Sequence, residues 1–277
     1  MPVAKVNGIN LYYEVHGEGE PLLWVGGLGA NIREIPHLVE TYSQRYRFIV
    51  YEGRGCGRSD KPEEDYSIAG LGDDAAGLLD ALGVPSAYVY GSSMGGMIAQ
   101  ELTLNHPQKV RALVLGCTTA GAVRGERPSQ NTIAKMMRNQ SLSGDEAIVA
   151  GWELGYSAAY VAAHREEMLV RSRAAAELAA PREAYMRQVI ASAKHDTYER
   201  LQYIECPVLI LHGSNDLMIP SGNAHLMKRA MPQADIVILE GAGHGYNLEF
   251  QAEADALVFG FLDRVRKPAE SATDAVR

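Results

Sequence analysis

The chain has 277 residues, enough for one large α/β domain with an inserted subdomain. Its 47% hydrophobic and 22% charged residues are typical of a globular protein. The net charge is −8 and Lys or Arg runs are absent, so neither nucleic acid nor a membrane surface is an expected partner. Because no stretch is as apolar as a membrane span and the first residues do not resemble a signal peptide, we expect a cytoplasmic protein.

Short apolar strands alternate with helices in the first part of the chain. Asn7-Gly8 predicts a hairpin over residues 5–14, because Asn-Gly favours the tight turn between antiparallel strands. Asn31 and Glu34 have the spacing of a capping box and predict a helix that ends before Arg45. This alternation favours a mostly parallel sheet with helices on both faces. The other elements expected here are strands at 22–25, 47–51, 87–90 and 110–115, and helices at 66–82 and around 97–102.

The pattern changes at about residue 118, after which only helical signals occur as far as residue 202. Pro128-Ser129 and Pro181 each predict the start of a helix. Ser143, Gly144, Asp145 and Glu146 together have the spacing of a capping box. Residues 118–202 are therefore predicted to form a helical cap.

Strands return after this insertion, at 207–211 and 234–239, and an amphipathic helix follows at 251–264. The polar tail from Lys267 is expected to be frayed. The sequence thus predicts a core domain made of residues 1–117 and 203–277.

The segment Gly91-Ser92-Ser93-Met94-Gly95 matches the pattern G-x-S-x-G between a predicted strand and a predicted helix. In that context the pattern is typical of a nucleophile elbow, a sharp turn that lifts the central serine above the sheet edge. The positions two residues before and after Ser93 need small residues, and Gly91 and Gly95 meet that need. A Gly/Ser-rich turn without chemistry also matches these five residues, so the interpretation depends on the downstream sequence.

A serine becomes a strong nucleophile when a base accepts its proton and a third group orients that base. Asp216 lies in the loop after the strand at 207–211, and His244 lies in a glycine-flanked turn after the last predicted strand. Open α/β sheets place their chemistry at this edge, beyond the carboxyl ends of the strands. We therefore predict the catalytic triad Ser93, Asp216 and His244.

Other residues compete for these roles. Asp216 is also placed to be an ordinary turn residue before Pro220. Glu240 lies on a suitable loop but is too close in sequence to His244 to orient it comfortably. His212 is the rival histidine, and its place beside Asp216 favours a packed supporting role. The remaining histidines fit exposed or capping positions, and we expect no metal site among them: His16, His37, His106, His164, His195 and His225.

An oxyanion hole needs two N–H donors directed at developing negative charge. The Met94 N–H at the start of the predicted helix is one candidate. The second is expected in the loop Gly26-Gly27-Leu28-Gly29, most directly from the Leu28 N–H, because glycine neighbours let the backbone approach a substrate closely.

The chain resembles the α/β-hydrolases with a helical cap over nearly its whole length. The resemblance is carried by the elbow at 91–96, the loop Arg54 to Ser59, the segment His212 to Asp216, and Gly243-His244. It implies an eight-stranded sheet with an inserted cap. The branch it resembles contains small carboxylesterases, enol-lactonases and C–C hydrolases, with cofactor-free haloperoxidase-like proteins as near relatives.

Two positions depart from the pattern of that family. Gly26-Gly27 stands where His-Gly is usual, so the ordering contact of the histidine is missing. Glu52 stands where Asp is usual, before the Arg-Gly loop. Neither change removes a reacting group, but both concern the oxyanion loop. Arg54 is interpreted as a structural residue that ties its loop down.

The resulting functional hypothesis is a serine esterase or lactonase that acts on a small, largely apolar molecule and needs no cofactor or metal. C–C bond hydrolysis, haloperoxidase-like activity, acyl transfer and ligand binding without turnover stay open as alternatives, as does a homodimer. Ser93 at the elbow argues against dehalogenase or epoxide hydrolase chemistry, which would need an aspartate. The cap carries the side chains expected over the pocket or in the cap's own core: Met136, Met137, Trp152, Tyr156, Tyr160, Met168, Tyr185 and Met186.

The three cysteines predict neither a disulfide framework nor a metal-ligand pattern. Cys117 and Cys206 adjoin predicted strands and are interpreted as small buried hydrophobic residues. A cationic cluster is not evident near the motifs, which weakly disfavours a highly anionic substrate, although the cap arginines could contribute: Arg124, Arg127, Arg138 and Arg171.

Overall fold

A computed structural model gives the fold, and the structure describes residues 2–266. Eight strands form one sheet in the order β1-β2-β4-β3-β5-β6-β7-β8. The pairs β1–β2 and β2–β4 are antiparallel and all other neighbours are parallel, so the predicted sheet is confirmed. The strands are β1 (Val3–Val6), β2 (Ile9–His16), β3 (Pro21–Val25), β4 (Arg47–Tyr51), β5 (Ala87–Ser92), β6 (Val110–Gly116), β7 (Val208–Gly213) and β8 (Asp235–Leu239).

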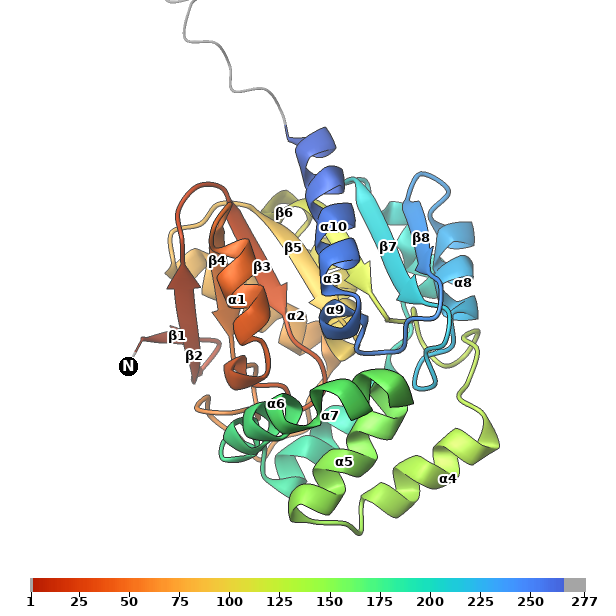
Figure 1. Cartoon of the computed structure of the whole chain (residues 1–277). Coiled ribbons are helices and arrows are strands. Elements are labelled where there is room, and N and C mark those ends of the chain that lie inside the picture. Colours follow the sequence, from red (N-terminus) through yellow and green to blue (C-terminus); the bar gives the residue numbers. More distant parts are fainter. Residues whose placement is uncertain (1, 267–277) are drawn as a thin grey trace, which may run out of the picture.

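Helices cover both faces of this sheet (Figure 1). Successive strand residues bury their side chains on opposite faces: Leu23 and Val89 belong to one apolar cluster, Leu22 and Tyr88 to the other. One cluster packs against α2 (Ile68–Ala81), α3 (Met94–Asn105) and α8 (Gly222–Ala230). The other packs against α1 (Pro36–Tyr42), α9 (Tyr246–Glu249) and α10 (Gln251–Val265).

The first turns of the chain show where local sequence rules succeed and where they compete. Asn7 and Gly8 have φ values of 46° and 82°, so the predicted hairpin turn is confirmed. Asn31 and Glu34 form the predicted capping box, but it starts only the short 3₁₀ helix η1 (Ile32–Glu34). The single helix predicted from residue 31 is wrong, because Ile35 precedes Pro36 and leaves the helical conformation before α1 begins at that proline.

Four helices lie between β6 and β7, and we call them the cap: α4 (Gln130–Asn139), α5 (Gly144–Gly155), α6 (Ala158–Ala176) and α7 (Arg182–Lys194). The 3₁₀ helix η3 (Tyr198–Tyr203) and a second one, η2 (Pro107–Lys109), complete the helical elements of the described chain. Figure 1 shows the cap gathered at one end of the sheet, with α4 outermost.

The helix starts predicted in the cap have mixed outcomes. Ser129 caps α4 as predicted, accepting a bond from the Thr132 N–H at 3.1 Å. The capping box predicted at Ser143 is wrong, since its side chain accepts no hydrogen bond and Gly144 turns the chain into α5 with a φ of 56°. The tail predicted to be frayed from Lys267 lies outside the described residues. Within those residues, no helix combines the length and apolarity that crossing a membrane requires.

Candidate active site

The turn between β5 and α3 forces Ser93 into an uncommon backbone conformation, with φ 58° and ψ −125°. Such conformations persist only when surrounding structure imposes them. A Cβ on Gly95 would lie 2.0 Å from the Val25 carbonyl oxygen, and one on Gly91 would lie 2.3 Å from the Gly95 carbonyl oxygen. Both glycines are therefore required by close backbone packing, as the sequence predicts for a nucleophile elbow.

Ser93, His244 and Asp216 meet at the carboxyl edge of the sheet. The distance from Ser93 Oγ to His244 Nε2 is 3.0 Å, and that from His244 Nδ1 to Asp216 Oδ2 is 2.8 Å. With the Nδ1 proton donated to the carboxylate, Nε2 is free to accept the proton of the serine hydroxyl. Three residues from separate loops thus form one continuous hydrogen-bonded chain.

Asp216 is held in place by bonds that leave one oxygen for His244. Its Oδ1 accepts the N–H groups of Met218 and Ile219, both at 2.9 Å, so Asp216 is also a turn residue. His212 is fully buried, and its Nε2 donates to the Ile219 carbonyl oxygen at 2.7 Å while lying 3.3 Å from Asp216 Oδ2. The rival histidine therefore supports the acid and does not contact Ser93.

The proton equilibria of this pair are shifted in opposite directions. Burial by itself raises the pKa of Asp216, but the charge of His244 and the hydrogen bond from His212 outweigh it and hold that pKa well below the usual range. Burial disfavours a charged His244, yet the Cys117 sulfur and the Asp216 carboxylate raise the pKa of His244 above its ordinary value. The site therefore favours a positive imidazole when Ser93 gives up its proton.

Cys117 lies in this site, although the sequence indicates only a small buried residue. It follows β6 with a φ of 38°, and its Sγ is 3.3 Å from Ser92 Oγ. Donor atoms of Cys117, Asp216 and His244 lie within 4.8 Å of one another, a spacing that a metal ion could also use. The imidazole and the carboxylate are already bonded to each other and to Ser93, Met218 and Ile219. The signal that could have revealed Cys117 is its place at the carboxyl end of a central strand.

Two backbone N–H groups are available beside Ser93. Met94 is the first residue of α3, so its N–H has no acceptor within the helix. The Leu28 N–H makes no hydrogen bond with any residue between 2 and 266. The loop comes close to the serine, because a Cβ on Gly27 would lie 3.2 Å from Ser93 Cβ. The loop that carries Leu28 thus approaches Ser93, and Met94 follows Ser93 directly in the chain.

A cavity of about 280 Å³ opens above Ser93 and His244. A second cavity, of about 540 Å³, lies against α5, α6 and the residues before α7, and it shares five wall residues with the first: Leu28, Asn31, Glu34, Tyr156 and Tyr185. Of the eight cap side chains proposed from the sequence, Trp152, Tyr156 and Tyr185 line these cavities. Met168 is buried and Met137 is 67% exposed, and neither is part of these walls.

The cavity wall also carries charges, which modifies the expectation of a largely apolar pocket. Glu34 faces both cavities with its surface accessible there, and desolvation by the surrounding cap residues raises its pKa to about 7 against the hydrogen bond from Asn31 and the charge of Arg171. Arg171 lines the larger cavity and forms no ion pair or hydrogen bond within residues 2–266. The sequence analysis placed Glu34 only in a capping box. Its place in the cavity wall depends on cap helices that lie far along the chain.

The two loop residues singled out from the sequence have structural partners. The Arg54 guanidinium donates to both carboxylate oxygens of Asp74, at 2.8 and 3.0 Å, in agreement with a structural role. Glu52 is fully buried and accepts bonds from the Arg58 backbone and side chain and from the Ile32 N–H. The longer glutamate therefore still ties this loop to η1.

Comparison with known proteins agrees with this architecture. Residues 16–250 match the family model of the alpha/beta hydrolase fold. The chain belongs to that family. This α/β-hydrolase is 28% identical over 269 residues to a protein of Azorhizobium caulinodans named as carbamate hydrolase RutD, covering 96% of this chain and 99% of that protein.

Two further similar proteins carry names that mention lactones. The 3-oxoadipate enol-lactonase 2 of Acinetobacter baylyi is 27% identical over 244 residues, which cover 87% of this chain and 88% of the lactonase. A solved structure of Est816, described as an N-acyl homoserine lactone degrading enzyme, superposes with a TM-score of 0.79 at 28% identity. That match covers 94% of this chain and all of the Est816 chain.

Proposed function

We propose that this α/β-hydrolase cleaves a carboxylic ester or lactone of a small molecule through an acyl-enzyme on Ser93. The observation that carries the proposal is the hydrogen-bonded chain Asp216–His244–Ser93 at the floor of a cavity. The N–H groups of Leu28 and Met94, which make no hydrogen bond with any residue between 2 and 266, support it. The names of the similar proteins, which mention lactones and a carbamate, favour acyl transfer to water over the other chemistries of this fold.

In the proposed reaction, Ser93 Oγ attacks the substrate carbonyl carbon while His244 Nε2 takes the hydroxyl proton. The carbonyl oxygen becomes an oxyanion that the Leu28 and Met94 N–H groups bind. The C–O bond to the leaving alcohol then breaks, and His244 returns the proton to that oxygen. In a lactone, the alcohol stays attached to the acyl group. A water molecule attacks the acyl-enzyme with His244 again as base, which releases the acid and restores Ser93.

Replacing Ser93 with alanine tests the proposal. The wild type is expected to turn over members of a panel of p-nitrophenyl esters of graded chain length, acyl lactones and aryl carbamates. Ser93→Ala should lose about 10⁴-fold or more in kcat, because removing a triad nucleophile removes the covalent route, while its thermal unfolding should stay close to that of the wild type. An organophosphate should label the wild type at Ser93 only. Full activity of Ser93→Ala would reject the mechanism.

The same panel separates the alternatives. Neither turnover nor organophosphate labelling of the wild type would favour a ligand-binding protein with this fold. Turnover of ring-cleavage diketones in preference to esters would indicate C–C bond hydrolysis. An acyltransferase would show itself if added alcohols or amines accept the acyl group faster than water does.

A further inference from the structure

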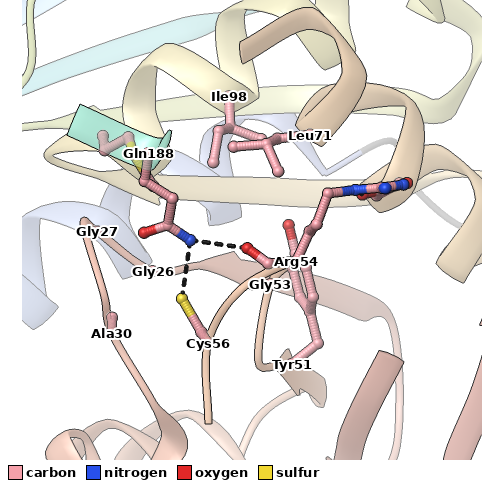
Figure 2. A pocket seen from close by; sticks show the side chains of 12 residues that line it. Gly26, Gly27, Ala30, Tyr51, Gly53, Arg54, Cys56, Leu71, Ile98 and Gln188 are labelled. Atoms are coloured by element: carbon pink, nitrogen blue, oxygen red, sulfur yellow. Dashed lines mark hydrogen bonds and ion pairs between the residues drawn. The ribbon is translucent and has the colours of Figure 1, made fainter. Parts of the chain in front are cut away.

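Gln188 of the cap makes three hydrogen bonds across the boundary with the core. It lies on α7 and is 1% exposed. Its Oε1 accepts the Gly29 N–H at 2.8 Å, and its Nε2 donates to the Arg54 carbonyl oxygen at 2.8 Å and to Cys56 Sγ at 3.0 Å. Figure 2 shows the two bonds from Nε2, with the amide pointing down between the two loops. One side chain therefore joins the oxyanion loop to the loop after β4.

The oxyanion loop, residues 26–29, has few other hydrogen bonds at this point. Gly26 and Gly27 have no side chains to pack, and a void of about 20 Å³, the space of about one water molecule, lies behind them. Within the loop itself, only the bond from the Ala30 N–H to the Gly27 carbonyl oxygen, at 3.2 Å, closes the turn. The histidine that is usual in place of Gly26 is also absent. The Leu28 side chain packs against the apolar core, and the hydrogen bond nearest to its N–H is the one between Gly29 and Gln188.

We propose that Gln188 is a positioning residue for the oxyanion hole, through which the cap holds the Leu28 N–H in place for the reacting carbonyl oxygen. The proposal rests on the acyl transfer proposed above. Leu28 and Gly29 are consecutive residues. A hydrogen bond that fixes the Gly29 N–H therefore also restricts the orientation of the neighbouring peptide group, which carries the Leu28 N–H. Geometry matters here, since a misplacement of about 1 Å can cost on the order of 100-fold in rate.

The chemistry of the site explains why an amide is needed at this position. Gly29 presents a donor and Arg54 an acceptor, so the residue between them must accept at one end and donate at the other. Leucine would fill a similar space but remove the partners of the part-buried Gly29 N–H and Arg54 carbonyl. A glutamate carboxylate would still accept from Gly29 but would place negative charge against the Arg54 carbonyl oxygen. A protonated glutamate would restore both bonds.

The test compares Gln188→Leu and Gln188→Glu with the wild type on p-nitrophenyl butyrate. Both variants should lose about 10- to 100-fold in kcat/KM through kcat, less than the ~100- to 1000-fold typical when an oxyanion donor is lost outright. The inhibition constant of an alkyl trifluoromethyl ketone, which adds to Ser93 and forms an oxyanion, should rise by the same factor. KM should change by less than about threefold.

Arg33→Ala is the matched control. Arg33 also crosses the boundary, donating to the Ala174 carbonyl oxygen of α6 at 3.0 Å, but it is exposed and does not contact the oxyanion loop. This variant should keep kcat/KM within about twofold. A second signature is pH-dependent rescue: the ratio of Gln188→Glu to wild-type kcat/KM should increase as the pH falls and the carboxyl gains a proton.

Other results would contradict either the role of Gln188 or the proposed function. Unchanged ketone affinity with a raised KM would mean that Gln188 only shapes the pocket, and equal losses in Arg33→Ala would mean that general cap docking matters. Either result overturns the inference. Wild-type turnover with unaffected Gln188 variants rejects the inference alone, whereas a wild type without turnover on any substrate rejects the proposed function as well. Thermal unfolding of Gln188→Glu, which keeps the side-chain volume, identifies any loss caused by misfolding.

Discussion

The core and the cap are held in place by different kinds of contact. The central strands β3 to β7 are buried on both faces, and Leu22, Leu23 and Leu113 are fully inaccessible. The cap leaves apolar side chains exposed, such as Val170 at 69%, and meets the core through individual hydrogen bonds, for example from Asn31 Nδ2 to the Ala175 carbonyl oxygen at 3.1 Å. Apolar packing thus fixes the strands that carry the reacting groups, whereas hydrogen bonds make a larger share of the contact between the cap and the core.

Asp216→Asn probes the core side of this comparison, where the largest effect is expected. Asparagine keeps the shape but loses the charge that stabilises protonated His244, and it can hold the imidazole in the wrong tautomer. We expect kcat to fall by about 10⁴-fold, as is typical for loss of the triad acid.

The pH profile of Asp216→Asn adds a directional test. The base must be neutral, so kcat/KM rises with pH through the pKa of His244. Because the Asp216 charge raises that pKa, its removal should move the acid limb to lower pH. Asp235→Asn, an exposed residue in an ion pair with Arg264, is the control. A profile that stays in place would show that Asp216 does not set this equilibrium.

Matched truncations, Leu113→Ala in β6 and Met168→Ala in α6, compare the stability of the two regions. Both side chains are 1% exposed or less. Leu113→Ala should lower the free energy of unfolding by about 2–5 kcal/mol, because it leaves a cavity between strands and helices. Met168→Ala should act mainly by local opening of the cap, with faster hydrogen exchange in residues 130–194 and a raised KM. Equal losses of global stability would show that cap and core unfold as one unit.

Glu34→Gln should have the smallest effect, and its sign depends on pH. Desolvation by the cap residues around the cavity raises the pKa of Glu34 from 4.5 to about 7, although its surface is accessible, so the folded chain binds this proton more tightly than the unfolded chain does. Wild-type stability should therefore fall as the pH rises from about 4.5 to about 7. The melting temperature of Glu34→Gln relative to the wild type should increase between pH 5 and pH 8. Glu253→Gln on the exposed face of α10 controls for the change in net charge, and a difference independent of pH would contradict the assignment.

Local rules were sufficient for most of the core. Alternating buried runs gave the strands, Asn7-Gly8 gave the hairpin, and glycine spacing gave the elbow, because each depends on residues close in sequence. The triad followed from one further rule, that the carboxyl ends of parallel strands share an edge. The break at Ile35 was missed, although the rule that a residue before proline avoids the helical conformation would have predicted it.

The contacts between the cap and the core could not be predicted from local sequence patterns. The roles of Glu34, Arg171 and Gln188 depend on α6 and α7 meeting loops more than a hundred residues away, and no local pattern encodes that approach. Gln188 lies on a helix that is only weakly amphipathic, where a buried amide resembles any other polar residue. The Ser143 capping box failed for a local reason instead: the neighbouring Gly144 adopts a left-handed conformation, and the Ser143 side chain accepts no hydrogen bond.

The hydrogen bond from Gly29 of the oxyanion loop to Gln188 of the cap matters for the recombination of homologous proteins. Exchanging caps is an attractive way to transplant substrate preference, since the nucleophile, base and acid all stay with the parent. In this chain, such a graft would also remove the amide that braces Gly29, so a donor cap must bring a side chain of matching polarity. Under the proposed role of Gln188, an exchange of the cap would change the rate together with the selectivity.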